Sequence, residues 1–549
     1  MQLYAPITEQ GSGRMKRWAW WALLVCGALL LAACGPVGDN SSSGGSNAPA
    51  SGNLRNGGTL TVALADDPDV LDPTLARTLV GRTVFTSLCE KLYDVDKDLN
   101  VVPQLAASMP ETSPDGMTAT IKLRQGVKFN DGTDFDAAAV KKSLDRHRTL
   151  DGSQRQSELL AVAGVDVVDP STVRINLKQP FAPLAAVLAD RSGMIMSPAQ
   201  LDKLGDKFGT NPVCVGPFKF SSRVAQDRIE LVKSDQYYDK AKVHFDKIVY
   251  KPIPDQNIRL ANLRSGDVQV AEAIQPTDVP SVRNDSNLQL IEAGSLGYQG
   301  ITINLNNTKG LYPAPTGKVP GALASDPRVR HAFELSLDRD TLNKVVFNGL
   351  YEPTCSPISL NSPYASPELS KCPPHDVNQA KALLAQAGVK TPVPVELMTD
   401  NSPLATRIGQ AIQSMAKEAG FAVKLRPTEF ATALDDSDAG KFQAFTVGWS
   451  GRVDPDGNIS NFQLSQGSQN VTRASDKNID DLIIQARSTT DVNQRKQLYA
   501  QIIKATQQRD NIIYLYRVKT FVGVSKKVGG VTVFSDSLLR VAFAGNTTS

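Results

Sequence analysis

Residues 393–426 read VPVELMTDNSPLATRIGQAIQSMAKEAGFAVKLR, with two short apolar runs on either side of a longer amphipathic one. The runs Val393–Met398 and Ala422–Arg426 have the length and composition of strands. Between them, apolar residues recur at helical spacing over Ala405–Ala419, which predicts a helix. A strand–helix–strand succession is typical of an α/β domain.

The same alternation continues towards both ends of the chain. Apolar patterns predict strands at Gly58–Ala65, Val173–Leu177 and Asn511–Arg517. Helical spacing predicts helices within Thr78–Tyr93 and at Ala137–Arg146. Strands and helices mixed throughout favour α/β lobes over an all-α or all-β fold.

The N-terminus has the features of an export signal. Lys16 and Arg17 precede the apolar run 18–33, which is about as long as a signal-peptide core and slightly short for a membrane span. The run leads directly into Cys34 through Leu-Ala-Ala, which looks like a bacterial lipobox. We therefore expect residues 1–33 to be a signal peptide and Cys34 to be lipidated. The alternative is a plain signal peptide or signal anchor in which Cys34 is incidental.

Residues 34–57 are rich in Gly, Ser, Asn, Ala and Pro. Such a composition buries little apolar surface and predicts a flexible linker. The expected location is the outer face of the cytoplasmic membrane, with the lipid as anchor, on the periplasmic side where an outer membrane exists.

The composition sets outer limits on the function. The 549 residues are enough for two or three domains of about 100–200 residues each. Hydrophobic residues make up 41% and charged residues 21%, as in ordinary globular proteins. Lys and Arg total 59 against 56 for Asp and Glu, so no excess of positive charge suggests a nucleic-acid partner.

Four cysteines follow the lipobox: Cys89, Cys214, Cys355 and Cys372. An even number in an exported protein suggests two disulfides, and three pairings are possible. Cys355–Cys372 is favoured because the two are close in a Pro-rich stretch, which leaves Cys89–Cys214. A buried free thiol at Cys89 is the alternative. No metal site is expected, because no cysteines have C-x-x-C spacing and the four histidines are scattered.

Four short motifs carry a family resemblance. They are Leu123–Gly132 (LRQGVKFNDG), Val215–Phe220 (VGPFKF), Ser325–Ala332 (SDPRVRHA) and Gly448–Asp456 (GWSGRVDPD). In this order they resemble family 5 of the extracytoplasmic solute-binding proteins, which serve peptide and nickel ABC importers. The resemblance extends over nearly the whole chain after the linker.

The resemblance implies a two-lobed periplasmic-binding-protein fold, large and type II-like, with an additional middle domain. Lobe I would be assembled from residues 57–96, 206–296 and 517–549. The middle domain would span 97–205, and lobe II would span 297–516. The chain crossings between the lobes would form the hinge.

The resemblance also implies where the ligand lies. Trp449 follows a predicted strand and is expected in the cleft, where its ring could stack on a ligand. In the family's peptide binders an aspartate three residues later holds the ligand ammonium, but here that residue is Arg452. Either Asp454 takes over this role or Arg452 grips an anionic group. The alternative is that Arg452 and Asp454 pair with each other on a solvated rim.

Four further residues are candidate ligand contacts. Tyr298, Gln299 and Asn304 lie where the family's chain enters lobe II, and Asp66 ends the first strand of lobe I. Ordinary strand or turn roles are the alternative for each of them.

The resulting hypothesis is a monomeric, lipid-anchored receptor without a cofactor. It captures short peptides by hinge closure and delivers them to ABC permease subunits that work with cytoplasmic ATPases. Alternative ligands are a nickel–metallophore complex, haem or a carboxylate-rich, opine-like solute. A lipid-anchored hydrolase is a distant alternative, because no G-x-S-x-G, H-E-x-x-H or P-loop motif is present.

Overall fold

The computed structural model describes residues 54–368 and 370–548. The predicted signal peptide, Cys34 and residues 34–53 of the predicted linker lie outside this range. The last linker residues include β1 (Leu54–Arg55), which pairs with β24 (Gly545–Thr547) near the C-terminus. The folded part therefore begins slightly earlier than predicted. In the part of the chain that the structure describes, no helix has both the length and the apolar character needed to cross a bilayer.

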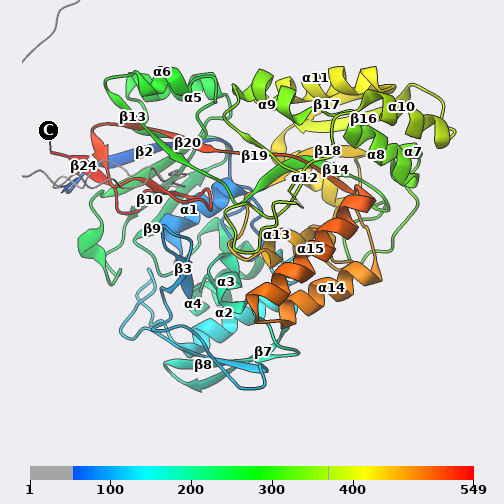
Figure 1. Cartoon of the computed structure of the whole chain (residues 1–549). Coiled ribbons are helices and arrows are strands. Elements are labelled where there is room, and N and C mark those ends of the chain that lie inside the picture. The colour runs from blue at the N-terminus through cyan, green and yellow to red at the C-terminus, as the bar shows by residue number, and fades with distance from the viewer. Residues whose placement is uncertain (1–53, 369, 549) are drawn as a thin grey trace, which may run out of the picture. The chain divides into compact units, whose positions relative to one another are not determined.

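Lobe I is built on a seven-stranded mixed sheet with strand order β13-β20-β12-β2-β11-β10-β9. The alternating sequence of β2 buries Leu60, Val62 and Leu64 in the core of this lobe. Its strands are β2 (Thr59–Leu64), β9 (Phe218–Val224), β10 (Arg228–Lys233), β11 (Lys247–Pro252), β12 (Val270–Ala271), β13 (Leu288–Ala293) and β20 (Thr520–Ser525). Its helices are α1 (Leu79–Leu88), α5 (Gln256–Ser265) and α6 (Val279–Arg283), the last two above the sheet in Figure 1.

Lobe II is built on a six-stranded sheet with order β15-β19-β14-β18-β16-β17. Its strands are β14 (Tyr298–Ile303), β15 (Glu352–Pro353), β16 (Val393–Asp400), β17 (Phe421–Thr428), β18 (Ala444–Trp449) and β19 (Ile512–Arg517). Its helices are α7 (Ala322–Ser325), α8 (Pro327–Leu335), α9 (Arg339–Phe347), α10 (Val377–Gln386), α11 (Pro403–Glu418), α12 (Phe430–Asp438), α13 (Asp456–Gln463), α14 (Lys477–Ser488) and α15 (Val492–Arg509).

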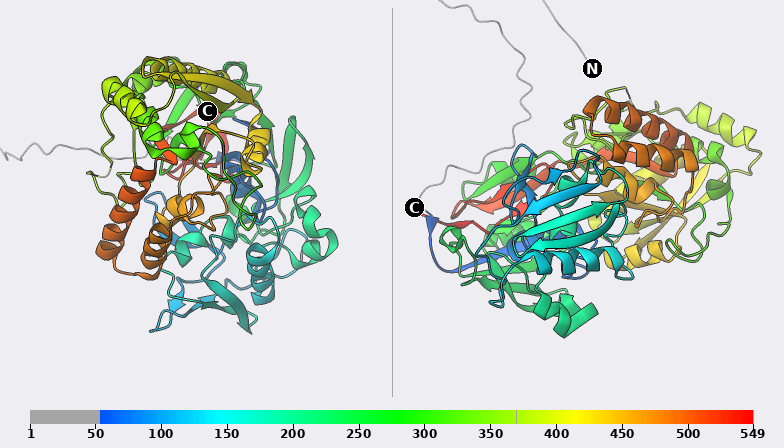
Figure 2. Two further views of the ribbon diagram at one scale, coloured as in Figure 1. Left: turned by 90° about the vertical axis from the view of Figure 1, so that its right-hand side faces the viewer. Right: turned by 90° about the horizontal axis from the view of Figure 1, so that it is seen from below.

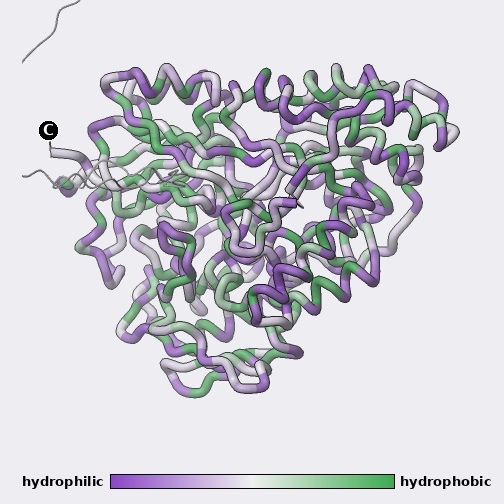
Figure 3. The backbone as a smooth tube through the Cα atoms, in the orientation of Figure 1, coloured by the Kyte–Doolittle hydropathy of each residue, from purple (hydrophilic) through white to green (hydrophobic). Residues whose placement is uncertain are grey.

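The segment 393–426 forms the strand–helix–strand unit that its pattern predicts. β16 and β17 are parallel neighbours, and α11 connects them. The Ser402 side chain caps α11 by accepting a hydrogen bond from the backbone N–H of Ala405. Ile408 and Ile412 on α11 pack into the core of lobe II. Hydrophilic and hydrophobic residues alternate along the outer helices in Figure 3, as one-sided packing requires. The α/β prediction is confirmed.

The proposed middle domain, 97–205, contains a four-stranded antiparallel sheet with order β5-β6-β8-β7. The Asp136 side chain caps α2, which packs with this sheet around its own core. β7 and β8 lie at the bottom of Figure 1, and the right view of Figure 2 shows this sheet in cyan. The strands are β4 (Val101–Pro103), β5 (Glu111–Thr112), β6 (Thr118–Lys122), β7 (Val162–Asp169) and β8 (Thr172–Leu177), and the helices are α2 (Ala137–Thr149), α3 (Leu184–Val187) and α4 (Pro198–Leu204). Short strands outside the three large sheets are β3 (Tyr93–Val95), β21 (Val528–Gly529), β22 (Thr532–Val533) and β23 (Leu539–Arg540).

Two chain crossings join the lobes. One runs from β13 to β14 and the other from β19 to β20. The buried side chain of Arg517 ties them together, because its guanidinium donates to the carbonyl oxygens of Leu296 at 3.3 Å and Gly297 at 2.5 Å. It also donates to the carbonyl of Ser356 at 2.6 Å.

The structure contains the two expected disulfides. Cys89–Cys214 joins the end of α1 to the loop before β9, across 125 residues of sequence. Cys355–Cys372 closes a loop in lobe II over 17 residues.

The two disulfides should differ in their contribution to stability. Replacing Cys89 and Cys214 by alanine should lower the free energy of unfolding by about 5 kcal/mol, and replacing Cys355 and Cys372 by about 3 kcal/mol, because the longer crosslink constrains the unfolded chain more. Urea titration of both double variants checks this order. A larger loss for the Cys355–Cys372 pair, or free thiols in non-reducing peptide mapping, would contradict it.

Candidate ligand-binding site

A cavity of about 660 Å³ lies between lobe I and lobe II. Its volume is within the range of about 300–1,000 Å³ that is typical of small-ligand sites. Both lobes supply its walls, and Gln154 of the proposed middle domain also contributes. A ligand in this cavity would contact both lobes at once.

The cavity lies at the carboxyl ends of parallel strands in both lobes. In lobe I, β2 is parallel to β11 and β12, and the chain leaves β2 and β12 at Asp66 and Glu272. In lobe II, β16 is parallel to β17 and β18, whose ends present Asp400, Glu429 and Trp449. Ligands of open α/β sheets bind outside such strand ends. The topology thus directs polar side chains from both lobes into one cavity.

Aromatic side chains form an apolar part of the wall. Trp449 and Tyr298 face each other across the β14–β18 pair and line the cavity with Phe462. Phe462 lies edge-on to both rings, with centroid distances of 4.9 Å to Trp449 and 6.1 Å to Tyr298. The Trp449 Nε1–H donates to Asn458 at 3.0 Å, which fixes the ring. The Tyr298 hydroxyl is buried and has no hydrogen-bond partner within the described residues.

The structure places Arg452 outside the lining of the cavity. Its guanidinium is buried, pairs with Asp190 of the middle domain and lies 4.1 Å from the centroid of the Trp449 ring. Burial, with Arg82 nearby, lowers the pKa of Arg452 to about 9. Arg452 therefore packs on the Trp449 ring from outside the cavity lining. The expectation that Arg452 binds an anionic ligand gains no support from this geometry.

Asp454 and Asn304 also lie outside the cavity lining. Asp454 accepts two hydrogen bonds from Arg495, at 2.7 and 2.9 Å, and so does not pair with Arg452. Asn304 donates to the backbone carbonyls of Asn307 at 2.9 Å and Phe442 at 3.0 Å. Both side chains organise lobe II. Of the remaining candidates, Asp66, Tyr298, Gln299 and Trp449 line the cavity.

Several carboxylates in the cavity were not among the predicted site residues. They are Glu272, Asp400, Glu429 and Asp438. Asp400 lies two residues after the predicted strand Val393–Met398, so the strand-end rule could have indicated it. Burial raises the pKa of Asp66 to about 6, and the charges of Glu429 and Asp400 add to the increase.

Ion pairs join the lobes beside the cavity. Arg77 of lobe I is 2.6 Å from Asp438 and 2.8 Å from Asp435, both on α12 of lobe II. Burial raises the pKa of Asp438 to about 6, although Arg77 acts in the opposite direction. Arg407 of lobe II also donates to Gln275 of lobe I. The structure thus shows the lobes in contact, as in a closed form.

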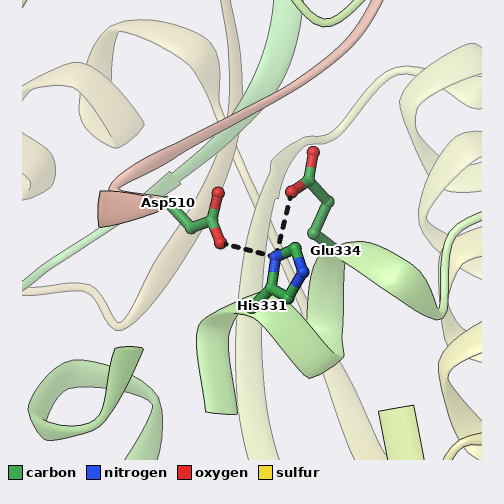
Figure 4. A group of neighbouring side chains, drawn as sticks. All are labelled: His331, Glu334 and Asp510. Carbon is green, nitrogen blue, oxygen red and sulfur yellow. Dashed lines mark hydrogen bonds and ion pairs between the residues drawn. The ribbon is translucent and has the colours of Figure 1, made fainter. Parts of the chain in front are cut away.

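A separate cluster in lobe II has the residue types of a metal site (Figure 4). His331 Nδ1 is 3.1 Å from Asp510 and 3.6 Å from Glu334. Hydrogen bonds to these carboxylates raise the pKa of His331 to about 10. Arg339 binds the other oxygen of Glu334 at 2.7 Å. A protonated imidazole between two carboxylates forms an ion-pair network, which here joins α8 to the end of α15.

Comparison with known proteins identifies the family. The model of "Bacterial extracellular solute-binding proteins, family 5 Middle" matches residues 100–470. The glutathione-binding protein GsiB of Escherichia coli K12 is 28% identical over 491 residues, covering 87% of this chain and 92% of GsiB.

Two solved structures have the same fold. The binding protein AgaA from A. tumefaciens R10, in complex with agropinic acid, has a TM-score of 0.78 at 28% identity, covering 88% of this chain and 96% of AgaA. The oligopeptide-binding protein AppA of Bacillus subtilis, in complex with a nonapeptide, has a TM-score of 0.81 at 22% identity, covering 90% of this chain and all of AppA, and shows the shared two-lobed fold. The chain therefore belongs to family 5 of the bacterial extracellular solute-binding proteins and is a substrate-binding protein of an ABC importer.

Proposed function

We propose that this protein captures short peptides between its lobes and delivers them to the importer's permease from a lipid anchor at Cys34. The observation that carries the proposal is the cavity of about 660 Å³ with walls from both lobes. Its apolar side, with Trp449 and Tyr298, would accommodate side chains, and its polar strand ends would bind backbone and charged groups. A relative that binds glutathione, a small peptide, supports a ligand of this size.

An opine-like solute is the second candidate. AgaA, whose structure contains agropinic acid, is 28% identical to this chain, as GsiB is. The carboxylates of Asp66, Asp400 and Glu429 argue against a carboxylate-rich ligand, since like charges would repel it. Peptide capture is therefore the better-supported function. A nickel complex and haem have no comparable support in the cavity.

Native mass spectrometry of protein that begins after Cys34 tests the ligand class. We expect a set of co-purified masses that fragment as short peptides. Trp449→Ala should lose them, because it removes the aromatic wall. Exposed Tyr312→Ala, outside the cavity lining, is the matched control and should retain them. One discrete non-peptide mass in the wild-type protein would contradict the peptide proposal.

Arg77 should stabilise the closed arrangement of the lobes. Arg77→Ala removes the pairs with Asp435 and Asp438, so bound peptide should dissociate about three- to tenfold faster, in line with a partly buried ion pair. Stopped-flow fluorescence of Trp449 measures this rate. Arg228→Ala, which removes an exposed pair within lobe I, is the control. Equal dissociation rates in the two variants would show that Arg77 does not hold the lobes closed.

The ligand-free protein should close more readily in acid. In the closed structure the pKa values of Asp66 and Asp438 are about 6, and opening would return them towards their ordinary value near 3.8. The closed form then binds protons more strongly, so its population rises as the pH falls through about 6. Small-angle X-ray scattering should show a smaller radius of gyration at pH 5 than at pH 7.5.

The acid effect has an internal control. Asp66→Asn removes one titrating group and should reduce the change, whereas the exposed Asp227→Asn should not. Asp67, Asp400 and Glu429 face Asp66, and Arg77 and Asp435 face Asp438. A radius of gyration that is constant or rises in acid would contradict the prediction.

A further inference from the structure

Carboxylates outnumber cations in the lining of the cavity. Asp66, Asp67, Glu272, Asp400, Glu429 and Asp438 line it, together with the cationic side chains Arg77 and Arg259. The question is which of these carboxylates a protein cation already neutralises.

The two arginines are already engaged. Arg77 pairs with Asp435 and Asp438. Arg259 is buried and donates to the backbone carbonyls of Glu272 at 2.7 Å and Ala273 at 2.9 Å. Both side chains are therefore held in place by the protein, and neither is available as a mobile partner for other carboxylates of the cavity.

Several of the remaining carboxylates are not paired with a cation of the protein. Asp67 pairs with Arg223 at 3.1 Å, whereas Asp66, Glu272, Asp400 and Glu429 form no ion pair within the described residues. Glu272 is set apart from the other three because it is buried, and burial raises its pKa. The hydrogen bonds of Asp66, Asp400 and Glu429 are local: Asp66 accepts from the Asp67 N–H, Asp400 from the Ser402 N–H, and Glu429 caps α12. These contacts orient the carboxylates without neutralising them.

We propose that the ligand places a cationic group, an ammonium or a guanidinium, among Asp66, Asp400 and Glu429. This inference rests on the proposed capture of a ligand in the cavity. A second observation supports a polar ligand in this cavity: Tyr298 is only 3% exposed and lines the cavity, and its hydroxyl has no hydrogen-bond partner within the described residues. A ligand with hydrogen-bonding groups would satisfy it.

The arrangement couples ligand charge to closure. Asp66 belongs to lobe I, whereas Asp400 and Glu429 belong to lobe II. Closure without a cation brings like charges together. Burial is the main cause of the raised pKa of Asp66, and the charges of Glu429 and Asp400 add to it. A cation between them turns this repulsion into attraction, and only the closed form provides all three carboxylates. Closure thus selects positively charged ligands.

This site differs from the one that the family resemblance implied. There an aspartate three residues after the tryptophan would hold the ammonium, but Arg452 occupies that position and is buried against Asp190. The proposed cation site uses strand ends of both lobes instead.

Binding of matched peptides to the full chain in detergent tests the proposal. The probes are trialanine, N-acetyl-trialanine, an N-acetyl tripeptide with a central lysine, and agmatine as a non-peptide cation. Calorimetry should show trialanine binding at least about tenfold more tightly than N-acetyl-trialanine, because acetylation removes the ammonium. The double variant Asp66→Asn, Asp400→Asn should reduce this difference to about twofold or less.

The outcomes separate the possible sources of the cation. If the lysine peptide recovers the affinity lost on acetylation, a side-chain ammonium occupies the site; if it does not, the site takes the N-terminal ammonium. Binding of agmatine but of no peptide would support the cation site and refute peptide capture. Equal binding of all three peptides in the wild-type protein would overturn the cation site and leave peptide capture intact.

Two controls exclude a trivial loss of binding. Asp227→Asn, exposed and outside the cavity lining, should retain the wild-type preference for trialanine. Thermal melting should show that the double variant remains folded. It should bind N-acetyl-trialanine at least as tightly as the wild type does, because removing two like charges eases closure around a ligand without a cationic group. A double variant that still prefers trialanine tenfold would also overturn the proposal.

Discussion

The buried guanidinium of Arg517 holds the two crossings between the lobes at one place. Burial lowers its pKa to about 10, so it stays charged at neutral pH. A buried charge is costly unless its hydrogen bonds are satisfied. Here the carbonyls of Leu296, Gly297 and Ser356 accept hydrogen bonds from both terminal nitrogens, whereas the buried Nε has no partner within the described residues. The chain enters lobe II through β14 and leaves it through β19, and Arg517 ties these two strands together. The strand ends of the two sheets therefore meet in a defined orientation, on which the cavity depends.

Two charge arrangements with different roles lie on opposite sides of Trp449. Behind the ring, Arg452 and Arg82 both pair with Asp190, which links lobe II, lobe I and the middle domain. In front, the cavity contains carboxylates that have no cation of their own. In the first arrangement both arginines are paired with a carboxylate of the protein, and Arg452 packs on the Trp449 ring. In the second arrangement the carboxylates are available to pair with a ligand in the cavity.

The sequence was informative wherever a local pattern decides the structure. The strand–helix–strand unit at 393–426 and the position of Asp66 at a strand end both follow from short-range rules. Arg452 shows the limit of such rules, because its partner Asp190 lies in another domain and no spacing connects them. The carboxylate group in the cavity is likewise a tertiary property: Asp66, Asp400 and Glu429 come together only when two sheets face each other. Asp400 and Glu429 each follow a predicted strand, yet that alone does not show which strand ends meet.

The position of β20 has a consequence for the order of assembly during synthesis. This strand, Thr520–Ser525, is not at an edge of the lobe I sheet but between β12 and β13, and the whole of lobe II lies between β13 and β20 in the chain. The strands of lobe II are complete once β19 has been made, whereas the first lobe in sequence still lacks an interior strand. Pairings of such large sequence separation form slowly. Lobe I, although it begins first, is thus the last to complete its sheet, and the strand edges that β20 later pairs with stay open to other strands until the C-terminal segment has been made.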